Sequence, residues 1–175
     1  MMETWISDEM RSAIGREFGT VIRSLPICAS DIRKWALAIY WPKPPPKLFW
    51  DEAYAATTQH RGIVAPEEFN PFAWFTADGP VLPRESSQNP LRSGPEGALK
   101  ISAPDTHVAL NGGREIVHGV RMRPGDVITQ GPTKLVDYRE RSTRHGLTLI
   151  TVTESTWTNQ SEETVRVTRG TSLRY

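Results

Sequence analysis

The side chains that most often carry catalytic or metal chemistry are sparse in this chain. Its four histidines are His60, His107, His118 and His145, and no two of them have the spacing of a zinc-ligand pair. The single cysteine, Cys28, excludes an intrachain disulfide and a cysteine-based zinc site, and it is typical of a reducing compartment. We therefore expect no metal site, and His107 and His118 remain as fallback candidates for a general base.

The sequence context that a nucleophilic serine or a phosphate-binding loop needs is missing from this chain. Ser86, Ser87 and Ser93 lie in a proline-rich stretch, without the strand–turn–helix setting of a nucleophile elbow. The glycines of LNGG at 110–113 are not flanked by the strand and helix of a phosphate loop. Neither pattern predicts a hydrolase or a nucleotide-binding protein.

A set of basic side chains offers one further kind of chemistry, the binding of phosphate groups. Arginine and lysine bind phosphate well, and a thioester carried by coenzyme A brings phosphates with it. The same residues also suit an ordinary solvated surface, which is the more common role of exposed charges. The residues are Arg84, Arg92, Lys100, Arg114, Arg121 and Arg123.

Length and composition indicate how many domains the chain forms and which classes of protein it does not belong to. The chain has 175 residues, of which 38% are hydrophobic, so it can bury one core and is expected to be a single domain, 1–175. Its 21 basic and 20 acidic residues leave a net charge of +1, which argues against a nucleic-acid-binding protein. No apolar run is long enough to span a membrane and no signal peptide is visible, so we expect a soluble, cytoplasmic protein.

Two helices are expected in the first third of the chain. Ser30 or Asp31 is a candidate N-cap for the first, which must end near Tyr40 because four prolines follow within 42–46. The apolar positions of this helix, at three- and four-residue spacing, are Ile32, Trp35, Ala36 and Ile39. Asp51 is the expected N-cap of a second, shorter helix.

The middle of the chain is expected to form a third helix and a long loop. Within 62–75, Pro66 suits the first turn of a helix, and Glu67 and Glu68 follow where acidic residues are favoured. Pro71 would bend this helix or delay its start. Residues 76–107 are rich in proline, glycine and serine, and such a loop is either a lid or a surface excursion.

The last third of the chain is expected to be β-structure. Runs rich in valine, isoleucine and threonine predict strands over 114–122, 127–141, 147–159 and 164–174. Turns are expected at 123–126, 144–146 and 159–163. Helices followed by an antiparallel meander predict an α+β fold.

An ordered set of motifs resembles the MaoC-like hot-dog dehydratases and hydratases, and most of all their N-terminal dehydratase-type domain. The resemblance covers about residues 10–175. Its motifs are IGRE at 14–17, DIRKWALAI at 31–39, DEAYA at 51–55, GIVAP at 62–66, LNGGREI at 110–116, VRMRPGDVI at 120–128 and VTESTWTNQ at 152–160. The resemblance implies an antiparallel β-sheet wrapped around a central α-helix, which 62–75 would form. It also implies that two units pair through their sheets, with an acyl-thioester site between them.

The family's reaction, as the resemblance implies it, is the reversible hydration of an enoyl thioester to a 3-hydroxyacyl thioester. A His and an Asp in a D-x-N-P-x-H motif handle the water and the proton. Counted back from DEAYA, these positions fall on Phe49 and Pro44, and neither side chain can accept a proton. Glu67 stands where active relatives tend to have Gly after the helix proline, and a carboxylate there would oppose a developing oxyanion.

We therefore interpret the chain as the accessory, substrate-binding subunit of a heteromeric hydratase or dehydratase. A catalytic hot-dog partner would supply Asp and His, and coenzyme A would enter only as part of the thioester, with no separate cofactor. The residues expected to contact the substrate are Tyr40, Trp41, Phe49, Trp50, Ile63, Val64 and Ala65. A core or interface role for the aromatic residues stays open, as do a homodimeric hydratase with relocated catalytic groups and a non-catalytic acyl-CoA-binding or scaffold protein. The acyl group, and the choice between coenzyme A and acyl-carrier protein, also stay open.

Overall fold

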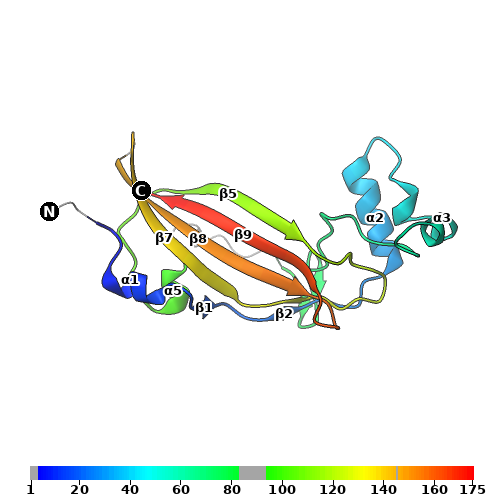
Figure 1. Ribbon diagram of the computed structural model, residues 1–175, viewed down its shortest axis with the longest axis horizontal. Helices are drawn as coiled ribbons and strands as arrows, with labels where there is room; N and C mark the ends of the chain where they lie inside the picture. The colour runs from blue at the N-terminus through cyan, green and yellow to red at the C-terminus, as the bar shows by residue number, and fades with distance from the viewer. Residues whose placement is uncertain (1–3, 83–93, 145) are drawn as a thin grey trace.

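The computed structural model describes residues 4–82, 94–144 and 146–175, and a curved antiparallel sheet dominates it (Figure 1). Four long strands lie side by side in the order β5–β9–β8–β7. Their bounds are β5 Ala109–His118, β7 Thr133–Thr143, β8 Gly146–Thr158 and β9 Thr164–Arg174. Short strands β1 (Glu17–Phe18), β2 (Ile22–Arg23) and β6 (Thr129–Gln130) complete the seven-stranded sheet.

The strand predictions hold closely toward the C-terminus. Strand β9 has the bounds that the sequence predicts, and the turn before it is confirmed by the Asn159 side chain, whose oxygen accepts hydrogen bonds from the amides of Ser161 and Glu163. The run expected over 127–141 is divided into β6 and β7, because Pro132 follows Gly131 between them. Strand β5 begins and ends earlier than expected, at Ala109 and His118.

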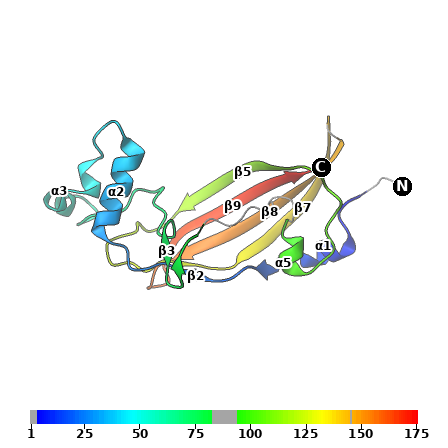
Figure 2. The same ribbon diagram turned by 180° about the vertical axis from the view of Figure 1, so that it is seen from behind.

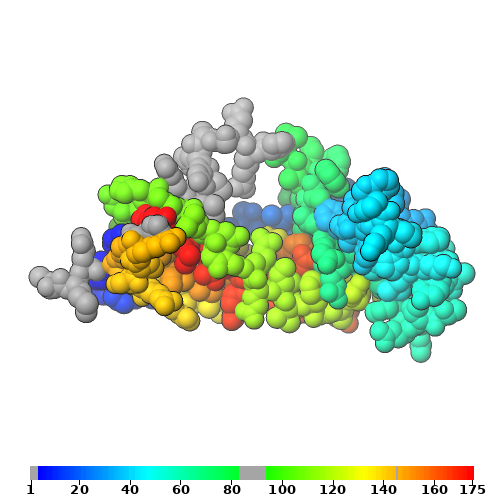
Figure 3. All heavy atoms as spheres, turned by 90° about the horizontal axis from the view of Figure 1, so that it is seen from above, coloured from blue at the N-terminus to red at the C-terminus, as the bar shows by residue number. Residues whose placement is uncertain are grey.

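Helices gather at the two ends of the sheet (Figures 1 and 2). At one end lie α1 (Asp8–Ala13) and α5 (Glu96–Leu99). At the other end lie α2 (Ala29–Tyr40), the 3-10 helix η1 (Lys47–Phe49) and α3 (Glu52–Thr57), which together extend beyond the strands (Figure 3). As predicted, α2 ends before the proline run, and the Asp51 carboxylate accepts the amide of Tyr54 at 2.9 Å to cap α3. The predicted N-cap of α2 is wrong, because the helix already begins at Ala29, with Cys28 as its N-cap and Ser30 and Asp31 in its first turn. Among the described helices, none is long and apolar enough to cross a membrane.

The third helix expected over 62–75 is not formed, and this part of the prediction is wrong. All of these residues are described, and they form bends and turns that end in a small hairpin of β3 (Phe75–Thr76) and β4 (Gly79–Pro80). Helical hydrogen bonds from residue 71 to Glu67 and from residue 66 to Gly62 are impossible, because both donors would be prolines. The loop expected over 76–107 also carries structure at its described ends, namely this hairpin and α5, whereas 83–93 lie outside the described residues.

Two separate apolar cores lie at the two ends of the sheet. One core joins α2 and α3 to the turn at 63–69 and to Trp157, and it includes Ile32, Ala36, Phe49 and Val64. The other joins α1 and α5 to the strands, and it includes Met10, Leu99, Leu135 and Leu149. Between these cores the sheet has no apolar packing from the residues that the structure describes.

A buried charge cluster holds α5 against the sheet. Arg174 on β9 and Glu96 on α5 are both fully enclosed, and the guanidinium contacts the two carboxylate oxygens at 2.6 and 2.9 Å. The hydroxyl of Tyr138 donates to Glu96 at 2.6 Å, and Thr151 accepts from Arg174 at 3.2 Å. Burial raises the pKa of Tyr138, so its hydroxyl stays protonated and keeps donating.

Candidate functional site

The position that the resemblance assigns to the catalytic His lies in the core. The side chain of Phe49 is 6% exposed and packs with Ile32, Ala36 and Ala55. Its ring centroid lies 5.9 Å from that of Tyr40. Pro44, at the position of the family's Asp, is exposed in the proline segment. A water molecule could not be activated here by either side chain.

The seven residues expected to contact the substrate fall into two groups. Four of them are buried in one core, namely Phe49, Ile63, Val64 and Ala65. Three lie at the surface: Trp41 is 75% exposed, Trp50 is 40% exposed and Tyr40 is 37% exposed. The indole of Trp50 donates to the carbonyl oxygen of Pro45 at 3.0 Å, which holds it against the proline segment. The structure therefore does not bring the seven together in one cavity, and a substrate role for the exposed aromatics stays a prediction.

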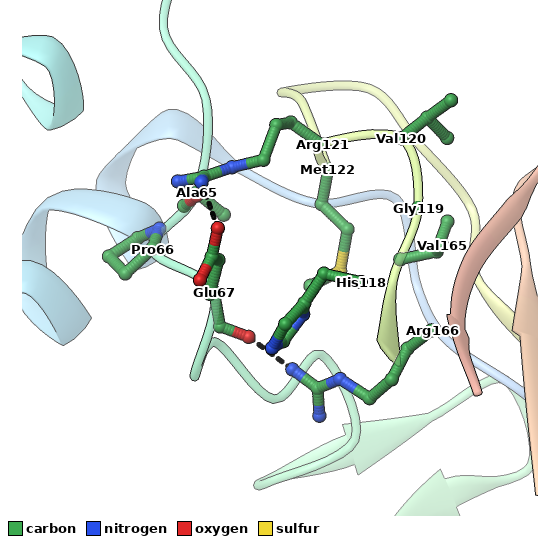
Figure 4. Close-up of a pocket in the computed structure, with 10 residues that line it drawn as sticks. All are labelled: Ala65, Pro66, Glu67, His118, Gly119, Val120, Arg121, Met122, Val165 and Arg166. Carbon is green, nitrogen blue, oxygen red and sulfur yellow. Dashed lines mark hydrogen bonds and ion pairs between the residues drawn. The ribbon is translucent and has the colours of Figure 1, made fainter. Parts of the chain in front are cut away.

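A small pocket lies where the turn at 65–67 meets the end of β5 (Figure 4). Arg121 crosses it, and its two terminal nitrogens contact the carboxylate of Glu67 and the carbonyl oxygen of Ala65, each at 2.8 Å. The amide of Ala65 in turn donates to the carbonyl oxygen of Met122 at 2.8 Å. The charge of Glu67 is thus balanced by the adjacent guanidinium of Arg121.

Arg166 fixes the same turn from the sheet side. Its guanidinium donates to the carbonyl oxygens of Glu67 and Phe69, the second at 3.3 Å, and it stacks on the Trp157 ring with 4.2 Å to the centroid. The residue is 8% exposed, and its Nε has no hydrogen-bond partner among the described residues. Burial lowers the pKa of Arg166, and the positive charge of Arg114 lowers it further.

Arg166 was not singled out by the sequence. Alternation on β9 is the only signal for it, because Arg166 lies between the apolar residues Val165 and Val167 and therefore on the opposite face. Whether Arg166 is buried depends on which face of β9 is covered. That face is covered by the turn at 65–69, which is about 100 residues away in sequence and so could not be read from β9 itself.

A glycine allows the sheet to close beside this pocket. Gly119 follows β5, and its amide donates to the carbonyl oxygen of Val165 at 2.9 Å. A Cβ atom on Gly119 would clash with the carbonyl oxygen of Thr164. Only glycine therefore fits here without a shift of the backbone.

Among the described histidines, His60, His107 and His118, the structure shows no catalytic pair. His118 is exposed at the end of β5 and lines the pocket near Arg166 (Figure 4). His107 is exposed, and its backbone amide donates to the carbonyl oxygen of Tyr175 at 3.0 Å. His145 lies outside the described residues. In the described ranges, no group of three His, Cys, Asp or Glu residues could hold a metal ion.

Several solved structures with a similar fold are named as hydratases or dehydratases. A MaoC-like dehydratase from Rhodospirillum rubrum is 17% identical, with a TM-score of 0.54 and coverage of 93% of this chain and 92% of that chain. The ChsH1–ChsH2 complex from Mycobacterium tuberculosis is 20% identical, with a TM-score of 0.60 and coverage of 88% and 85%. The C-terminally truncated HadBC (3R-hydroxyacyl-ACP dehydratase) complex from the same organism is 17% identical, with a TM-score of 0.52 and coverage of 90% and 97%. At these identities the likeness shows the fold, which is the hot-dog fold that the sequence predicts.

Sequence comparison supplies the family. Among curated proteins, no significant match is found. The family model described as "FAS1-like, dehydratase domain region" matches residues 12–168, which is most of the chain. The match includes the turn at 65–69, the edge strand β5 and both arginines of the pocket. The chain therefore belongs to the family described as the FAS1-like dehydratase domain region.

Proposed function

We propose that this chain is the accessory, substrate-binding subunit of a heteromeric enoyl-thioester hydratase or 3-hydroxyacyl-thioester dehydratase. The observation that carries the proposal is the burial of Phe49 in the core, at the position of the family's His, with Pro44 at that of the Asp. Since Phe49 is part of the packing, a proton acceptor could not regain this position without loss of the core. The catalytic Asp and His would therefore come from a partner chain.

The free edge of β5 supports the presence of a partner. This strand pairs only with β9 in the described sheet, so its other edge offers backbone donors and acceptors to a further strand. Apolar side chains at this edge are unusually open, with Leu110 45% exposed, Ile116 38% exposed and Val117 60% exposed. A second hot-dog subunit would extend the sheet here and cover these side chains. Two of the similar solved structures, ChsH1–ChsH2 and HadBC, are named as complexes.

In the proposed reaction the partner would supply the catalytic groups and this chain would contact the substrate. The partner's base would take a proton from water, whose oxygen adds to C3 of the enoyl thioester, and a proton is delivered to C2. This chain would contribute the turn at 65–69, which Arg121 and Arg166 hold at the end of β5 and thus beside the incoming partner. The exposed Trp41 and Trp50 would guide the acyl group. The lone Cys28 supports a reducing, cytoplasmic location as part of the same proposal.

The test is an assay of the chain alone and with a partner. Crotonyl-CoA and a bulkier enoyl-CoA are offered to the purified chain, and we expect no hydration. The same assay is then run with the product of a neighbouring reading frame that carries an intact D-x-N-P-x-H motif, and we expect activity only in the mixture. Replacing the partner's His by Ala should abolish that activity.

Clear turnover by the chain alone would overturn the proposal. In that case His107→Ala and His118→Ala variants decide between the two relocated bases. A chain that stays inactive with its partner but binds acyl-CoA would instead be a binding or scaffold protein.

A further inference from the structure

The middle of the sheet's inner face is polar on β8 and β9, in contrast to both ends. The inner face is the one on which Leu135, Leu149 and Trp157 are buried. The two apolar cores cover its ends, beside α1 and α5 and beside the turn at 65–69 (Figure 1). In the middle rows, the inner-face side chains of β8 and β9 are small or hydroxylated and only partly buried, whereas β7 and β5 place the apolar Leu135 and Ile116 in the same rows. The small or hydroxylated residues are Thr153, Ser155, Thr168, Gly170 and Ser172. A face built to pack against a helix would be apolar along its whole length.

A groove of about 290 Å³ lies on this polar middle. It is lined by residues that lie directly opposite one another on the adjacent strands β8, β9 and β5. One row is Thr153, Gly170 and Arg114, and the next row includes Ser172 and Asn111. A single water molecule needs only about 10–15 Å³ of such space. The groove therefore has room for a ligand group of several atoms.

The groove carries an unpaired positive charge. Arg114 is exposed, and its side chain has no ion pair or hydrogen bond with any residue in the described ranges. The next arginine on the inner face, Arg166, is close enough for the charge of Arg114 to lower its pKa, after the larger effect of burial. The carboxylate of Glu68 raises the pKa of Arg166, which partly offsets the effect of Arg114. Glu68 lies in the turn at 65–69 and does not line the groove.

Neutral hydrogen-bond donors surround this charge. The side-chain oxygen of Asn111 accepts the amide of Gly113 at 2.9 Å, and its NH₂ group has no acceptor among the described residues. Thr153 and Ser172 add hydroxyl groups beside it. Gly170 has no side chain above the floor, which leaves the space open between Thr153 and Arg114. Guanidinium, amide and hydroxyl donors around an open floor suit an oxyanion.

We propose that this groove is a binding site for an anionic ligand group, a carboxylate or a phosphate, with Arg114 as its main contact. The inference goes beyond the subunit role, because it concerns residues of this chain alone and does not depend on where the catalytic groups lie. A carboxylate would come from an acidic acyl group, and a phosphate from the thioester carrier.

Backbone-amide NMR on the whole chain tests the site, with three probes that separate these sources. Glutarate represents the carboxylate, adenosine 3′,5′-bisphosphate represents the phosphate, and glutaramide is the uncharged control. We expect one or both anions, but not glutaramide, to shift the amides of Gly113, Arg114, Gly170 and Ser172. The Arg114→Gln variant should weaken this binding about tenfold or more, as for loss of a charge-assisted hydrogen bond.

Two further variants test whether binding depends on this groove in particular. Arg169→Gln is the matched control, since Arg169 lies one residue from Gly170 on the outer face, paired with Glu154 at 2.7 Å, and it should leave binding unchanged. Gly170→Val should block the groove, because a Cβ atom there meets only Thr153 Oγ1 at an ordinary 3.6 Å and causes no strain. Anion-induced shifts that persist in Arg114→Gln, or that are absent from the wild-type chain, would overturn the proposal.

Discussion

At the scale of single residues, the buried ion pair between Glu96 and Arg174 stabilises the fold only while both partners are present. Both side chains are fully enclosed, and Tyr138 completes the hydrogen bonds of the carboxylate. Removing one partner leaves the other charge buried and unpaired, which costs far more than a surface ion pair contributes.

We expect Arg174→Met to lower the free energy of unfolding by about 3–5 kcal/mol. Urea unfolding followed by circular dichroism measures the change. The matched control is Arg169→Met on the same strand, whose ion pair with Glu154 is exposed and should contribute less than about 1 kcal/mol. Equal losses in the two variants would contradict the assignment of the Glu96 pair as a buried anchor.

Gly119 carries a steric constraint that is equally local. We expect Gly119→Ala to destabilise the chain by about 1–3 kcal/mol, because the new methyl group would clash with the backbone of Thr164. The control is Gly97→Ala within α5, where a Cβ atom meets nothing within 4 Å and alanine favours the helix. Thermal unfolding of both variants compares them directly, and a lower midpoint is expected only for Gly119→Ala.

At the scale of elements, the long C-terminal strands and the Asp51 cap could be predicted from local patterns, whereas the N-cap of α2, which is Cys28 rather than Ser30 or Asp31, and the turn at 65–69 could not. Alternation and turn residues predict β9, and Asp51 marks the start of α3, because these signals lie within a few residues of the structure that they determine. The turn depends on Arg166, which is distant in sequence and takes the carbonyl groups of Glu67 and Phe69. The same holds for the candidate site. That Pro44 and Phe49 cannot accept a proton is visible in the sequence, whereas the inner-face groove could be found only from the strand register of the structure.

The turn should therefore loosen when Arg166 is replaced. In an Arg166→Met variant the carbonyl oxygens of Glu67 and Phe69 lose their donor, and we expect amide hydrogens of residues 65–72 to exchange faster by about tenfold or more. Hydrogen exchange read by mass spectrometry gives the local rate. Arg123→Met is the control, because it removes a similar contact to the carbonyl oxygen of His60 at an exposed position. Unchanged exchange at 65–72 in Arg166→Met would show that the turn holds without the arginine.

At the scale of the whole molecule, the open edge of β5 is where we expect the proposed partner to pair with this chain. We expect Val117→Glu to prevent formation of the complex without altering the fold, since this side chain is 60% exposed and lies on the edge strand. Val21→Asp is the control, because Val21 is 56% exposed but lies beside β2, at the opposite side of the sheet order. Size-exclusion chromatography with light scattering measures the complex, and loss of assembly in both variants would point away from β5.

The same edge has a consequence for synthesis of the chain. An uncovered strand with apolar side chains pairs with any other exposed strand that it meets, including that of an identical chain in a growing aggregate. Arg114 and Glu115 are the charged residues that interrupt the apolar side chains of β5. We therefore expect the chain to accumulate as insoluble protein when it is expressed alone at high level. Expression together with its partner should bring it into the soluble fraction, because the edge is then covered as soon as both chains fold.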